Sequence, residues 1–167
     1  VASVLGRMLA RAIEELLPAC GDTHPLVIPV PLHHTKFRER GFNQAELIAR
    51  TAVKRLEPLE LATGVLVRQR PTISQVGLTR EERISNVRDA FRVRDRRLVR
   101  GRTVIVVDDV MTTGTTLSEC AGVLKKAGAE RVWAATVARA FQAAAPRITA
   151  NHGDEEEIEA VAVAASV

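Results

Sequence analysis

The feature that most constrains the fold is a strand-like run that ends in two carboxylates. Residues 103–107 read Thr-Val-Ile-Val-Val, and Asp108 and Asp109 follow directly. A strand without polar alternation is typically buried on both faces, as in the parallel sheet of an α/β protein. Ligands of such sheets bind beyond the carboxyl ends of the strands. The sequence therefore predicts an α/β fold with a ligand site at Asp108 and Asp109.

A short segment rich in hydroxyl side chains connects these carboxylates to a predicted helix over 115–127. The start of a helix attracts anions through its N–H groups and dipole, and a glycine lets the backbone approach the ligand closely. The residues predicted to bind a phosphate are Thr112, Thr113, Gly114, Thr115 and Thr116. The carboxylates would repel that phosphate, so we expect them to face sugar hydroxyls or Mg²⁺. The alternative is a helix cap, for which one residue would suffice.

Strand and helix patterns alternate along the rest of the chain, which predicts a mostly parallel central sheet flanked by helices. Pro18 is expected to end the first helix, Asn43 to cap the second and Thr79 to begin the third with a capping box. The predicted helices are 4–17, 43–57, 80–88 and 115–127, and the predicted strands are 26–31, 64–67, 91–94, 103–107 and 132–137. We assign residues 1–141 to one domain. The remainder, 142–167, is an Ala-rich and then acidic tail, in which 158–163 has the composition of an edge strand.

Composition excludes several classes of protein. A hydrophobic content of 46% is too high for a disordered chain. Cys20 and Cys120 lie far apart without a CxxC pair, which argues against a zinc module or disulfide scaffold and favours a reducing cytoplasm. No stretch has the ~20 apolar residues of a membrane span, and the first residues do not resemble a signal peptide. Aromatic residues, at 3%, offer few platforms for stacking single-stranded nucleic acid.

Charge predicts an anionic partner for the middle of the chain. Residues 35–102 contain 17 Lys and Arg against 8 Asp and Glu, although a solvated basic surface would have the same composition. Arg40 and Gly41 precede a predicted helix, where a cation and N–H groups would suit a pyrophosphate; a simple loop and cap is the alternative. We expect solvated side chains for His33 and His34. Residues 68–78 are predicted to be an exposed loop, part of a basic segment that could fold over a diphosphate and contains Arg68, Arg70, Arg80 and Arg83.

The segment from Val104 to Thr116 resembles the phosphoribosyl pyrophosphate (PRPP) signature of type I phosphoribosyltransferases. In that signature an apolar strand is followed by Asp-Asp, two residues and Thr-Thr-Gly-x-Thr. The resemblance implies that Asp108 and Asp109 are the catalytic-site acids, which hold the ribose hydroxyls. It also implies that residues 112–116 surround the 5′-phosphate.

Further segments resemble the ComF family, phosphoribosyltransferase-like proteins associated with DNA uptake in competent bacteria. They are Ile-Pro-Val-Pro-Leu at 28–32, Arg-Gly-Phe-Asn-Gln-Ala at 40–45, and Arg-Pro-Thr at 70–72 leading to Asn-Val at 86–87. The resemblance implies a type I phosphoribosyltransferase-like fold with a small hood and a flexible loop carrying Arg70, Gln75 and Arg83. ComF proteins commonly begin with a four-cysteine zinc ribbon, which is not found in this sequence; either the ribbon was removed with the missing start, or this is a short member of the family. No metal is expected on cysteines or histidines, and Mg²⁺ is expected mainly with PRPP, with Asp108 and Asp109 as candidate protein ligands.

The resemblance implies transfer of a 5-phosphoribosyl group to a nitrogenous acceptor with release of pyrophosphate. The sequence does not identify the acceptor. The alternative is a non-catalytic PRPP- or nucleotide-binding accessory protein of competence, with DNA-processing proteins as partners. Direct binding of nucleic acid by the basic middle is a third hypothesis. Whether the chain forms a homodimer is left open.

Overall fold

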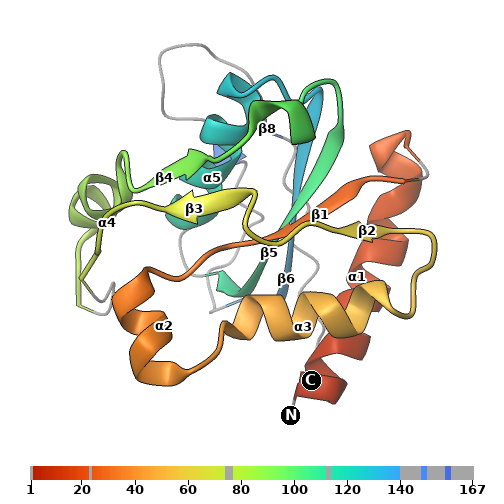
Figure 1. Ribbon diagram of the computed structural model, residues 1–167, viewed down its shortest axis with the longest axis horizontal. Helices are drawn as coiled ribbons and strands as arrows, with labels where there is room; N and C mark the ends of the chain where they lie inside the picture. The colour runs from red at the N-terminus through yellow and green to blue at the C-terminus, as the bar shows by residue number, and fades with distance from the viewer. Residues whose placement is uncertain are drawn as a thin grey trace.

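The computed structural model describes residues 2–22, 24–73, 77–111, 114–139, 148–149 and 157–158. At its centre lies a parallel sheet of four strands in the order β2-β1-β5-β6 (Figure 1). These strands are β1 (Leu26–Pro29), β2 (Glu60–Leu61), β5 (Thr103–Met111) and β6 (Arg131–Arg139). The predicted α/β architecture with a mostly parallel central sheet is confirmed.

Both faces of the sheet are covered by helices, which explains why β5 is apolar without alternation. Val104 and Val106 pack in one core with α5 (Thr115–Lys126). Ile105 and Val107 point to the other face, where they pack in a second core with α1 (Ala2–Cys20) and α3 (Gln44–Val53). In a parallel sheet this arrangement brings the carboxyl ends of β1 and β5 to one edge.

A smaller antiparallel hairpin packs against α5 outside this sheet. It consists of β3 (Leu66–Arg68) and β4 (Phe91–Val93), and α4 (Arg80–Val87) lies in the connection between them. The short helix α2 (His34–Arg40) follows β1 on the same side of the molecule as α4 (Figure 1). The remaining elements are η1 (Arg96–Leu98) and the paired strands β7 (Ile148–Thr149) and β8 (Glu157–Ile158).

Several predicted boundaries were wrong. α1 continues to Cys20 with Pro18 in its last turn, where a proline removes only one N–H donor. α3 ends at Val53 rather than 57, and β1 ends at Pro29. The predicted strand at 64–67 is β3, which pairs antiparallel with β4 and lies outside the central sheet. α2 was not predicted, because its seven residues lack an apolar stripe, and none of them is buried.

The predicted C-terminal tail is described at two short strands. β8 includes Ile158, the first residue of the predicted edge strand, and pairs with β7. Residues 159–163 lie outside the described part of the chain.

Candidate functional site

A pocket of about 200 Å³ opens at the carboxyl edge of the central sheet. It is lined by Asp108 and Asp109 from β5 and by Thr116 from the first turn of α5. Lys36 and Arg40, which belong to α2, also line it. The structure thus brings together four predicted site residues from two distant segments: Arg40, Asp108, Asp109 and Thr116.

The two carboxylates are held close to one another inside the last part of β5. The backbone N–H of Asp109 donates to Oδ1 of Asp108 at 2.9 Å, and that of Val110 donates to Oδ1 of Asp109 at 2.8 Å. Burial raises the pKa of Asp108 to about 7, and the neighbouring charge of Asp109 contributes to the rise. A partly desolvated acid pair of this kind is expected where a ligand supplies the missing partners.

The helix α5 begins at Thr115, directly after Gly114, as the sequence predicted. Gly114 adopts a left-handed conformation, with φ of 78°, and occupies the N-cap without a side-chain hydrogen bond. Its carbonyl accepts from the N–H of Ser118 at 2.8 Å, which begins the helix. Thr115 and Thr116 occupy the first turn. Thr112 and Thr113, the other two predicted phosphate-binding residues, lie outside the described part of the chain.

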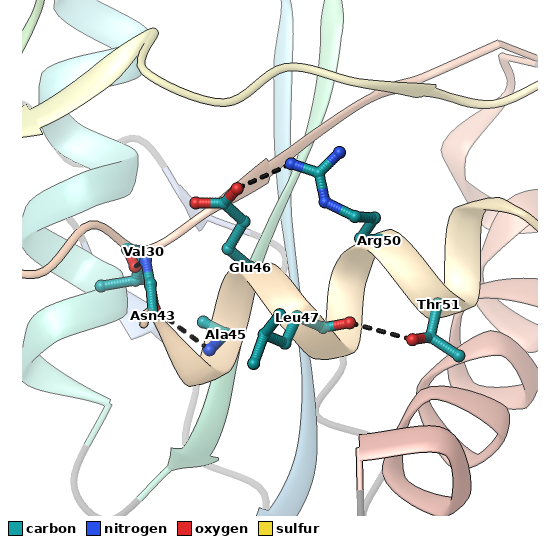
Figure 2. A network of polar contacts seen from close by, with 7 residues as sticks. All are labelled: Val30, Asn43, Ala45, Glu46, Leu47, Arg50 and Thr51. Atoms are coloured by element: carbon teal, nitrogen blue, oxygen red, sulfur yellow. Dashed lines mark hydrogen bonds and ion pairs between the residues drawn. The ribbon is translucent and has the colours of Figure 1, made fainter. Parts of the chain in front are cut away.

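Asn43 joins the end of β1 to the start of α3 (Figure 2). Its side-chain Nδ2 donates to the carbonyl of Val30 at 2.9 Å, and its Oδ1 accepts from the N–H of Ala45 at 3.1 Å. The predicted N-cap is therefore confirmed, and the same buried side chain also fixes the turn to the sheet. This second bond holds one wall of the pocket beside the carboxylates of β5.

The turn between α2 and α3 differs from the expected anion site at Arg40 and Gly41. Gly41 is the left-handed C-cap of α2, and its N–H donates to the carbonyl of Phe37 at 2.8 Å. That N–H is therefore not available to a ligand, while Arg40 is exposed and lines the pocket. His33, expected to be solvated, is instead buried as the N-cap of α2, and its ring accepts from the N–H of Thr35. Burial lowers the pKa of His33.

The predicted exposed loop 68–78 is largely structured in its described part. Arg68 lies in β3, and the side chain of Asn86 in α4 bonds to both backbone groups of Ile73, at 3.1 and 3.0 Å. The guanidinium of Arg70 bonds to the carbonyls of Arg88 and Ser85 at the end of α4. These bonds fasten residues 70–73 to α4.

The three predicted loop residues do not line the pocket in the described structure. Arg70 is used at the end of α4, Arg83 lies half-buried on α4, and Gln75 falls outside the described residues. The pocket instead contains Lys36, Arg68 and Thr72. Sequence reasoning missed Lys36 and Thr72 because their place depends on how α2 and β3 fold toward β5. The only sequence signal for Lys36 was the basic composition of the segment.

Comparison with known families decides what kind of protein has this geometry. The model of the phosphoribosyl transferase domain matches residues 41–165. This chain belongs to the phosphoribosyl transferase domain family. The match includes the strand β5, its carboxylates and the start of α5, and it extends beyond residue 141.

Curated relatives of this family member have names that concern DNA uptake and use. Competence protein F of Haemophilus influenzae is 34% identical over 142 residues, which is 81% of this chain and 62% of the relative. The DNA utilization protein YhgH of Escherichia coli strain K12 is 33% identical over 133 residues, which is 79% of this chain and 57% of the relative. The resemblance to the ComF family is confirmed, although the chain spans only about three fifths of these relatives.

Solved structures support the phosphoribosyltransferase fold. A hypothetical protein from Neisseria gonorrhoeae with bound ppGpp aligns with a TM-score of 0.54 and 18% identity, covering 96% of this chain and 79% of that one. Glutamine PRPP amidotransferase from B. subtilis aligns with a TM-score of 0.51 and 22% identity, covering 81% and 25%. Among the helices in the described part of the chain, none is long and apolar enough to cross a membrane.

Proposed function

We propose that this chain is a phosphoribosyltransferase that binds Mg²⁺-PRPP and transfers the 5-phosphoribosyl group to a nitrogenous acceptor. The acceptor nitrogen forms a bond to C1 of the ribose, the bond between C1 and the diphosphate breaks, and pyrophosphate leaves. The observation that carries the proposal is the pocket, whose lining combines two carboxylates, the first turn of α5 and two cations of α2.

Each part of the pocket suits one part of PRPP. Asp108 and Asp109 offer acceptor oxygens to the 2′- and 3′-hydroxyls of the ribose. The N-terminus of α5 suits the 5′-phosphate, because its N–H groups and dipole favour an anion. Lys36 and Arg40 suit the diphosphate, whose negative charge increases as it leaves. Together these contacts would orient C1 toward the acceptor.

Mg²⁺ fits this set of residues because two adjacent carboxylates supply the oxygen ligands that the ion prefers. Asp108 and Asp109 are the side chains that would hold it, and PRPP would supply further oxygens. When bound, the ion would neutralise negative charge on the pyrophosphate. The protein's own contribution is to position the ribose and the diphosphate around it.

The names of the relatives support a second candidate, a non-catalytic PRPP-binding component of competence. In both versions we place the protein in DNA uptake, with DNA-processing proteins as candidate partners. Cys20 and Cys120 are buried free thiols, which suits the cytoplasm. Release of pyrophosphate from PRPP in the presence of a panel of nucleobases and amines distinguishes the two candidates, because only an enzyme consumes PRPP.

Both candidate functions require the protein to bind PRPP, and a measurement of ligand-dependent stability tests this binding. A ligand at about 100 times its dissociation constant raises the free energy of unfolding by about 2.7 kcal/mol, so Mg²⁺-PRPP should raise the melting temperature. The double variant Asp108→Asn/Asp109→Asn should remain folded and lose this response. An unchanged melting temperature of the wild type over a millimolar PRPP titration would contradict the proposal.

A further inference from the structure

Thr136 is a threonine of the central sheet whose hydroxyl forms no hydrogen bond. It lies on β6, and its exposed fraction is 0%. Its Oγ1 is buried and has no partner among the described residues. A hydroxyl that is buried in this way costs free energy, and folded proteins contain few such groups. The neighbours of Thr136 on the sheet indicate what the hydroxyl serves.

Asp108 is the residue that stands beside Thr136 on the next strand. The parallel register of β5 and β6 pairs the two residues, and paired residues direct their side chains to the same face of a sheet. Val106 and Ala134, two positions earlier on each strand, pack in the core that contains α5, so this face is the one toward α5. Burial raises the pKa of Cys120 in α5, and the charge of Asp108 adds to the rise, which agrees with this placement.

The carboxylate of Asp108 has room for a further donor. Its Oδ1 accepts from the N–H of Asp109 at 2.9 Å, and a carboxylate can accept several hydrogen bonds. A carboxylate that must present an oxygen to a ligand is held in place by bonds from groups behind it, which fix its orientation. Thr136 suits this task, because its hydroxyl is a donor and its branched side chain has few rotamers.

We propose that Thr136 is a positioning residue for Asp108, whose carboxylate it holds toward the ribose by a hydrogen bond from its hydroxyl. The inference rests on the proposed function, which places the ribose at Asp108 and Asp109. The structure has no bond between the two side chains, so the bond forms by rotation of the side chains as the ligand binds. The unpartnered hydroxyl destabilises the free protein, and the complex recovers this loss.

Thr136→Val tests the assignment, because valine has nearly the shape of threonine but lacks the hydroxyl. Removal of an unpartnered buried hydroxyl should leave the melting temperature of the free protein unchanged or raise it. The same change should weaken the binding of Mg²⁺-PRPP and of ribose 5-phosphate about 10-fold in calorimetric titration of the intact chain. A threonine that served packing alone would leave both affinities unchanged.

Two further variants show whether the hydroxyl is the cause. Thr136→Ser keeps the hydroxyl and should bind both compounds within about threefold of the wild type. The matched control is Thr103→Val, the same change at a buried threonine at the opposite end of β5, and it should also stay within about threefold. If Thr136→Val does not fold, Thr136→Ser is compared with Thr136→Ala, from which it differs only by the hydroxyl, and should bind about 10-fold more tightly.

Four results would overturn the assignment. They are wild-type affinities in Thr136→Val, an equal loss in Thr136→Ser or Thr103→Val, a loss in Thr136→Val together with a lower melting temperature, and equal affinities of the serine and alanine variants. A wild type that binds neither compound would refute the proposed function and the assignment together. A wild type that binds both compounds with the same affinity as Thr136→Val would refute the assignment alone.

Discussion

At the scale of single residues, Asp108 has a carboxyl group whose burial disfavours its charged form. Its carboxylate lies at the end of a buried strand beside Asp109, and burial raises its pKa from 3.8 to about 7. The folded state therefore favours the protonated acid more than the unfolded chain does. The resulting stability is fully present below about pH 4 and is lost as the pH rises through about 7.

Asp108→Asn should consequently stabilise the protein at pH 8 and not at pH 4. The amide keeps an oxygen that can accept from the N–H of Asp109, while the charge is removed. The expected gain at pH 8 is on the order of 2 kcal/mol in the free energy of unfolding. Thermal melts at the two pH values measure it. Asp95→Asn is the control, because hydrogen bonds from Arg97 lower the pKa of Asp95 and its removal should give no gain. Equal melting temperatures of Asp108→Asn and wild type at pH 8 would refute the prediction.

Asn43 offers a second test, because its two hydrogen bonds can be removed separately. Asn43→Asp keeps the oxygen that caps α3 but loses the donor to the carbonyl of Val30, whereas Asn43→Ala loses both bonds. A lost cap costs about 1 kcal/mol, and a buried carbonyl without a donor costs about 1–3 kcal/mol. We expect destabilisation by both variants in urea unfolding. If Asn43→Asp unfolds at the same urea concentration as the wild type, the hydrogen bond to the carbonyl of Val30 contributes nothing to stability.

At the scale of elements, α1 and α3 cross closely at Gly6. A Cβ at this position would lie 2.5 Å from the Cβ of Thr51. Alanine improves helix propensity by about 1 kcal/mol, but overpacking costs about 1–3 kcal/mol, so Gly6→Ala should be destabilising. In a Thr51→Gly background the obstructing Cβ is absent and only the carbonyl of Ile48, at 3.3 Å, stays close, so the same change should cost much less. A double-mutant cycle by chemical denaturation measures this difference, and additive effects would contradict the close contact.

Local sequence patterns predicted most of these elements, but they did not predict the contacts between residues 70–73 and α4. The capping box of Thr79 and Glu82 begins α4 as expected, since both of its hydrogen bonds link residues three apart. The clamp from Asn86 to Ile73 joins residues 13 apart, and its partners are backbone groups with no sequence signature. For this reason residues 70–73, predicted to be an exposed loop, are instead fastened to α4.

At the scale of the whole molecule, the pocket is assembled from three segments that lie far apart in the chain. They are the β1–α3 connection, the end of β3 with Thr72 and Ile73, and the β5–α5 segment. A ligand that contacts all three should slow amide hydrogen exchange in all three at once, because opening any one of them would break ligand contacts. Exchange measured with and without Mg²⁺-PRPP tests this. The middle of α1 serves as the control, since none of its residues lines the pocket.

Protection limited to the start of α5 would mean that the ligand occupies the phosphate loop without engaging α2 or the hairpin. Such a result would contradict the three-sided site while leaving phosphate binding in place. The same experiment reports on residues 68–73, which begin the segment 68–83 that the sequence predicts could fold over a diphosphate. An unchanged exchange rate there would exclude the hairpin as a lid.

The sequence by itself determined the features that depend on neighbours along the chain. The unbroken apolar run before Asp108 indicated a strand buried on both faces, and Gly114 indicated the turn into α5, whose left-handed φ is nearly free of strain only for glycine. Only the tertiary structure decided which cations meet the carboxylates. Arg68 and Arg70 are both arginines of one basic segment, yet the first ends β3 and lines the pocket, whereas the second lies beyond the strand and bonds to carbonyls at the end of α4. Composition cannot distinguish them, because these contacts are made with residues distant in sequence.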